Sequence, residues 1–134
     1  MKLQTLLLSA ISITSMLLSC TKDNADIVST SAKIQNKWQI DSLVINQQIN
    51  GNSNKETRIG DKGDNIEFRS DGRMITYFQD VTDNSSFVVK NDSVIVIGGD
   101  SSYIEELTEN KFIFFSRASA GGVGFIEIRY YLSR

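Results

Sequence analysis

The sequence predicts an all-β fold, an eight-stranded antiparallel barrel whose strands follow one another as an up-and-down meander. Short runs rich in β-branched and aromatic residues recur along the chain, separated by turns of Gly, Asn, Asp and Ser. The chain has no proline, and no stretch of these runs shows a convincing helical period. Its 134 residues suit one domain. Eight strands can close on themselves and leave no exposed edge, and a two-sheet β-sandwich is the alternative that the same strands allow.

The expected strands can be placed by their alternation and by the turns between them. The first contains Trp38, and its alternation changes phase near Ser42, which predicts a β-bulge. Ser70-Asp71-Gly72 is a hairpin signal between the second and third strands, and Asn91-Asp92 and Glu109-Asn110 are expected as later turns. The strands are expected at residues 38–45, 66–69, 74–79, 87–90, 93–97, 103–107, 112–116 and 125–132.

One turn carries a definite expectation about register. A two-residue turn at Asn91-Asp92 pairs Val89 with Val94 and Phe87 with Val96, and it places these four side chains on the face toward the core.

The polar stretch from Asn46 to Asn65 is too long for a hairpin turn, which predicts a lid or binding loop. Within it, residues 61–65 offer oxygen ligands for calcium. They lack the alternating acidic pattern and the closing Glu of an EF-hand loop, so no metal site is expected.

The first 19 residues have the pattern of a signal peptide. Lys2 precedes an apolar stretch that polar residues interrupt and that is short for a membrane span. Leu17-Leu18-Ser19-Cys20 resembles a bacterial lipobox, and this resemblance implies that Cys20 is acylated and becomes the new N-terminus of a membrane-anchored lipoprotein. An ordinary signal peptide with an incidental cysteine is the alternative. Residues 20–32 are expected to be a flexible tether, and residues 33–134 the barrel domain.

The lipobox resemblance implies a place in the cell envelope, as an outer membrane lipoprotein. Thr21-Lys22-Asp23 loosely resembles the signals that send some lipoproteins to the cell surface. The same three residues also suit the solvated start of a linker, so the periplasmic and the surface-exposed faces both stay open.

Five short motifs carry a family resemblance, at residues 36–38, 66–72, 89–94, 107–112 and 128–132. With them the domain resembles the small lipocalin-like domains found behind lipobox leaders in bacterial lipoproteins. The resemblance implies an eight-stranded barrel, and in many relatives the ligand is unknown. Lipocalins place a Gly two residues before the first-strand Trp, where this chain has Asn36. They also pack a last-strand Arg across that Trp, and Arg129 is the matching candidate although its alternation places it on the opposite face.

Composition argues against several classes of function. Without histidine the chain lacks the commonest general base and metal ligand, so we expect no catalytic residues, no metal and no cofactor. Its 14 basic and 16 acidic residues are balanced, which argues against a nucleic-acid partner. Glu105 and Glu106 lie where the alternation breaks, so a bulge there either turns one carboxylate inward or leaves both solvated, and the second interpretation is favoured. The Gly-rich residues 118–124 lack the Lys and the helix of a phosphate-binding loop and are expected at the barrel rim.

Two functions remain. The barrel either binds a small apolar or amphipathic ligand, or it is filled by side chains and serves as a non-catalytic structural or interaction module at the cell surface; in both cases a monomer is expected. Asp92-Ser93-Val94 resembles the sites that some bacteria O-glycosylate, which makes Ser93 a candidate for modification. The aromatic side chains that either line a cavity or fill the core are Trp38, Phe68, Phe78, Phe87, Phe112, Phe114 and Tyr130.

Overall fold

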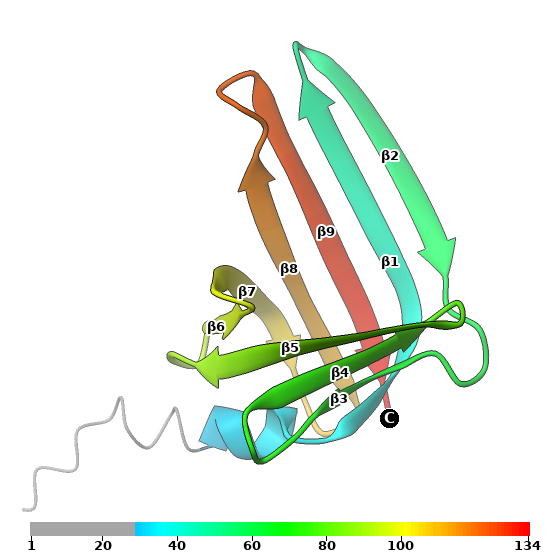
Figure 1. The fold of residues 1–134 in the computed structure, drawn as a ribbon, viewed down its shortest axis with the longest axis vertical. Coiled ribbons are helices and arrows are strands. Elements are labelled where there is room, and N and C mark those ends of the chain that lie inside the picture. Colours follow the sequence, from blue (N-terminus) through cyan, green and yellow to red (C-terminus); the bar gives the residue numbers. More distant parts are fainter. Residues whose placement is uncertain (1–28) are drawn as a thin grey trace, which may run out of the picture.

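A computed structural model describes residues 29–134 and shows a closed eight-stranded antiparallel barrel with one additional strand (Figure 1). The leader, Cys20 and the expected tether up to residue 28 lie outside the described residues. The strands are β1 (Lys37–Ile49), β2 (Asn52–Ile59), β3 (Asn65–Phe68), β4 (Arg73–Phe78), β5 (Val81–Val89), β6 (Val94–Ile97), β7 (Asp100–Leu107), β8 (Lys111–Ser119) and β9 (Gly124–Ser133).

The barrel consists of β1 and β3 to β9. Consecutive members pair antiparallel, and β1 closes the circle by pairing with β9 along its length. Eight of the nine strands therefore form the predicted meander, and the two-sheet sandwich is not what the chain forms.

Strand β2 was not expected, because residues 46–65 were predicted to be a lid or binding loop. Instead β1 continues to Ile49, turns at Asn50 and Gly51, and returns as β2, which pairs with residues 42–49 of β1. Asn50 and Gly51 have φ angles of 52° and 77°, the left-handed conformation that a two-residue hairpin turn requires. Every residue of β2 is exposed, so its sequence carries no apolar alternation that could have marked it as a strand.

The bulge expected near Ser42 is confirmed, because the pairing of β1 with β9 shifts between Ile40 and Ser42. Trp38 and Ile40 point into the core before the bulge, and Leu43 packs against the core after it. The intervening Asp41 is exposed and accepts a hydrogen bond from Ser133 Oγ at 2.7 Å. The extra residue thus keeps the apolar side chains of a long strand on one face.

The expected register of β5 and β6 is wrong by one residue. Phe87 pairs with Ile97 and Val89 with Ile95, because the turn is longer than two residues and closes through a hydrogen bond from Lys90 N to Val94 O. Ile95 is therefore the buried residue of β6.

One end of the barrel is filled and covered. A short helix at residues 29–34 includes Thr30 and Ile34, both buried, so residues before 33 also pack against the barrel. Trp38 Nε1 donates a hydrogen bond to Ile34 O at 3.0 Å. All buried hydrophobic residues of the described chain except Ile113 form one cluster at this end, which we call the base: Ile34, Trp38, Ile40, Ile66, Phe68, Met74, Phe87, Ile95, Phe112, Phe114 and Leu132. Within residues 29–134, no helix has the length and apolar character needed to span a membrane.

The other end is open and asymmetric. Strands β1, β2, β8 and β9 project beyond β3 to β5 (Figure 1); we call residues 42–59 and 117–127 of this projection the wing. Its two hairpin tips are joined by a hydrogen bond from Asn50 N to Val123 O at 2.9 Å. On the side of β6 and β7 the wall is low: residues 117–119 of β8 lie beyond their pairing with β7, and residues 81–85 of β5 lie beyond their pairing with β6. We call this gap the notch.

Candidate functional site

A cavity of about 550 Å³ occupies the open end, between the wing and the strands β6 and β7. Its volume lies within the range of about 300–1,000 Å³ that is usual for small-molecule sites. The side chains that face it come from five strands and include Met74, Ile97, Asp100, Ser102, Ser116, Ile126, Ile128 and Tyr130.

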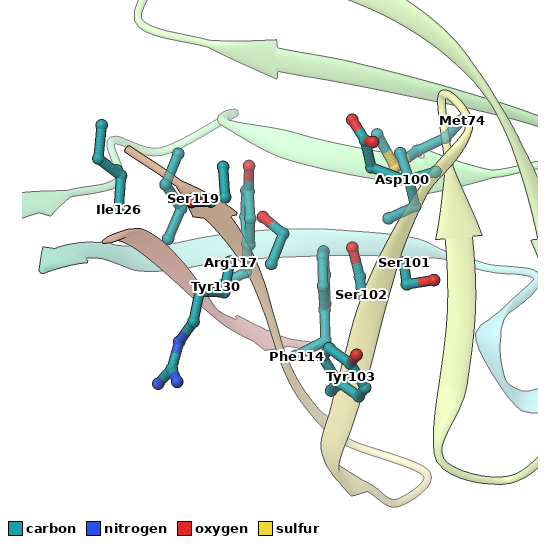
Figure 2. A pocket seen from close by; sticks show the side chains of 14 residues that line it. Met74, Asp100, Ser101, Ser102, Tyr103, Phe114, Arg117, Ser119, Ile126 and Tyr130 are labelled. Atoms are coloured by element: carbon teal, nitrogen blue, oxygen red, sulfur yellow. The ribbon is translucent and has the colours of Figure 1, made fainter. Parts of the chain in front are cut away.

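The cavity has an apolar and a polar part. Ile126 and Ile128 lie on the wing side, and Figure 2 shows Ile126 at one end of the cavity and Asp100 at the other. Hydroxyl groups of Ser102 and Ser116, which pair across β7 and β8, lie between them, and Ser102 is buried. This combination suits a ligand with both an apolar and a polar end.

The floor of the cavity is an aromatic stack. The rings of Phe114 and Tyr130 are parallel within 6°, with centroids 4.5 Å apart. Burial raises the pKa of the Tyr130 phenol, and the negative charge of Asp83 raises it further. The Asp83 side chain lies on the inward face of β5, which also carries Ser85 and buried Phe87. Tyr130 is therefore a neutral phenol at pH 7, able to donate and to accept a hydrogen bond.

The seven aromatic candidates separate into two groups. Trp38, Phe68, Phe87 and Phe112 are fully enclosed in the base and do not line the cavity. The rings of Phe68 and Phe87 meet edge to face with their centroids 5.1 Å apart, and the centroids of Trp38 and Phe112 are 5.5 Å apart. These rings therefore fill the barrel interior. Phe78 is half-buried against the same core.

Only Phe114 and Tyr130 of the seven face the cavity. A filled base and an open mouth therefore coexist, although the sequence presented them as alternatives.

Arg117 is the one basic residue that borders the cavity, but its charged group lies elsewhere. Figure 2 shows its guanidinium pointing away from the other labelled side chains. On the outer face of the sheet it donates to Glu127 Oε2 from Nε at 3.0 Å and from Nη2 at 2.5 Å. Glu127 is only 4% exposed and is also bonded to Arg129 Nη2 at 3.2 Å. This buried carboxylate could not be identified from the sequence, because its burial depends on cover from neighbouring strands.

An arginine does pack on Trp38, but it is Arg134, which directly follows β9, and not the last-strand candidate Arg129. Arg134 Cζ lies 4.5 Å from the centroid of the Trp38 ring. Arg129 was the candidate, and it instead faces outward, 3.4 Å from Glu105 and 5.2 Å from the Phe115 ring centroid. The alternation along β9 is regular, so no bulge brings Arg129 to the inner face.

The two carboxylates at the β7 irregularity are solvated, as the favoured interpretation had it. The predicted bulge lies between Ile104 and Glu106. Glu105 Oε2 lies 3.4 Å from Arg129 Nε, Glu106 Oε2 lies 2.8 Å from Lys111 Nζ, and neither glutamate lines the cavity.

In the turn at residues 61–65, the buried carboxylate accepts hydrogen bonds from the backbone. Asp64 is 3% exposed, and it accepts hydrogen bonds from Asp61 N at 2.9 Å and from Gln79 N at 3.0 Å. It thereby ties the start of β3 to the turn between β4 and β5. Over residues 29–134 no cluster of three or more acidic, His or Cys side chains is placed to hold a metal ion.

The remaining candidates are an exposed serine, the Gly-rich segment and the cysteine of the leader. Ser93 is exposed in the turn before β6, and its hydroxyl donates to Asp92 Oδ1 at 3.0 Å. Of residues 118–124, Ala118 and Ser119 end β8 and border the cavity, and the turn that follows at the tip of the wing is closed by Ala120 N donating to Gly124 O. Cys20 lies outside the described residues.

No protein-family model, curated protein or solved structure matches the chain.

Proposed function

We propose that this protein is a membrane-anchored lipoprotein, attached through acylated Cys20, whose lipocalin-like barrel binds a small apolar or amphipathic ligand. The observation that carries the binding proposal is the open cavity of about 550 Å³ above a base that side chains already fill. Because the core is complete without the mouth, the open end is free to hold a ligand. The lipobox-like residues 17–20 support the anchor and a place in the cell envelope.

Ligand binding can be tested on residues 21–134, which include the closed barrel and its whole core. We expect native mass spectrometry of the protein purified from its host to show a small bound molecule. Ile128→Trp, which fills the cavity from the wing side, should abolish the bound mass. Val44→Trp is the matched control. Ile128 pairs with the residue that follows Val44 in β1, so the Val44 side chain points to the opposite face of the sheet, and this variant should retain the bound molecule. A clean apo mass for the wild type, with no ligand taken up from a lipid extract, would refute binding.

The anchor can be tested by labelling cells with a radioactive fatty acid. Wild type should carry the label, and Cys20→Ala should not. Equal labelling of the two would show that the lipobox interpretation is wrong, whatever the barrel binds.

A second candidate function, a non-catalytic interaction module at the cell surface, is favoured by the outer face of the sheet. Tyr103 is 45% exposed and stacks on Phe115 at 5.4 Å. Together with Phe125 and Arg117 these rings border a groove of about 470 Å³. A photo-crosslinking amino acid in place of Phe125 would capture a protein partner in cells if this face is the working surface. The same photo-crosslinking amino acid in place of Ile128 would capture a small molecule if the cavity is the functional site.

A further inference from the structure

We propose that the ligand of the cavity is an amphiphile whose polar group donates hydrogen bonds and is cationic or neutral, and that the mouth selects against fatty-acid carboxylates. This rests on the proposed function and specifies its ligand class. The charges and hydrogen-bonding groups around the cavity carry it.

The polar end of the cavity presents oxygen acceptors. Asp100 is the only one of the 14 lining residues with a carboxylate. A second carboxylate, Asp83, lies outside the cavity lining on the inward face of β5, where Ser85 Oγ donates to its Oδ2 at 3.2 Å. An ionised carboxylate can only accept hydrogen bonds, so a ligand group near Asp100 must donate them.

Among residues 29–134, the two basic side chains of the wing that an anionic ligand at this site could approach, Arg117 and Arg58, are both paired with glutamates. The guanidinium of Arg117 is directed to the outer face and is held there by Glu127. Arg58, the nearest base on the inner face of the wing by register, is bonded to Glu56 at 2.7 Å. A fatty-acid headgroup would therefore meet Asp100 without a compensating charge.

Selection against the wrong partner by like charge is a common source of specificity. The opposite end of the cavity, at Ile126 and Ile128, presents apolar surface that does not distinguish a fatty amine from a fatty acid of the same chain length. Discrimination thus depends on the headgroup alone. Three ligands with one alkyl chain form a matched set for testing it.

The experiment measures binding of decylamine, decanol and decanoate to residues 21–134 at pH 7 by isothermal titration calorimetry, below the concentrations at which they form micelles. We expect decylamine and decanol each to bind at least about tenfold more tightly than decanoate, which is the ratio that about 1.4 kcal/mol produces. Asp100→Asn should bring the affinities for decylamine and decanoate together. Asp92→Asn changes the net charge equally, lies in the exposed β5–β6 turn, and should leave the wild-type ratio unchanged.

Decanoate binding as tightly as decylamine to the wild type would overturn the inference and leave the proposed binding function standing. Failure of all three ligands to bind would overturn both. If Asp100→Asn does not fold, the comparison of the three ligands on the wild type still decides.

Discussion

The guanidinium of Arg134 lies over the indole ring of Trp38, 4.5 Å from its centroid, while Trp38 Nε1 donates to Ile34 O. Arg134 also donates from Nε to Glu109 O at 2.6 Å. Three separate parts of the chain, the helix at residues 29–34, the turn before β8 and the end of β9, therefore meet around one ring. This junction closes the base of the barrel.

Arg134→Ala is expected to lower the free energy of unfolding by about 1–2 kcal/mol, because a partly desolvated cation–π contact is lost together with the hydrogen bond that the charged guanidinium donates to Glu109 O. Urea unfolding followed by the fluorescence of Trp38, the only tryptophan, measures it. Arg129→Ala is the control that should leave the Trp38 emission maximum in place. An unchanged stability for Arg134→Ala would show that the stacking does not hold the base together.

The register of β5 and β6 predicts opposite outcomes for two aliphatic truncations. Ile95 is fully buried, so Ile95→Ala should cost about 2–5 kcal/mol. Val88, on the neighbouring strand, is 55% exposed, and Val88→Ala should change stability by no more than about 0.5 kcal/mol. Thermal unfolding of the pair checks it, and similar costs for both would contradict the register.

Asp64 is expected to be the acidic side chain of the 61–65 turn that matters for stability. Asp64→Ala leaves the N–H groups of Asp61 and Gln79 without their acceptor, which should cost about 1–3 kcal/mol. Asp61→Ala removes a carboxylate from the same turn but no acceptor of these bonds and should cost much less. Addition of calcium to either protein should give no rescue, and a rescue would indicate a metal site after all.

Tyr130 should make the protein less stable at high pH. Burial and the charge of Asp83 raise the pKa of Tyr130 in the folded protein above that of about 10 in the unfolded chain. Its contribution to stability is therefore complete below the unfolded pKa and is lost as the pH rises through the folded pKa. Tyr130→Phe should flatten the decline of stability above about pH 10. Spectroscopic titration of the tyrosinates should show Asp83→Asn lowering one pKa, and no such change when Tyr130 is already Phe.

Much of the barrel could be predicted from the sequence, namely the strands that have one solvent-exposed and one buried face. The bulge near Ser42 and the outward direction of Arg129 on β9 were both predicted correctly, because an apolar period of two survives in these strands. Strand β2 could not be recovered, because both of its faces are exposed and its partner alone defines it.

The wrong register predicted for β5 and β6 and the choice of Arg129 in place of Arg134 as the partner of Trp38 have a common physical origin. The packing of distant segments determines how the turn from Lys90 to Val94 closes and that Arg134 contacts Trp38. The local alternation of apolar residues carries no information about either contact. The cavity was anticipated only in part for the same reason. Aromatic residues could be identified as inward-facing, but whether a ring fills the base or floors the mouth depends on its height along the barrel axis, which requires the closed structure.

The notch bears on how fast a ligand can exchange. Residues 81–85 of β5 and 117–119 of β8 each lack a strand partner on the side facing the gap, and the turn at Gly98 and Gly99 lies below them. The ligand proposed above, with its headgroup at Asp100, would pass this low wall without the breaking of a hydrogen bond between strands. For a ligand of the kind proposed above, this geometry favours fast release over long-term storage.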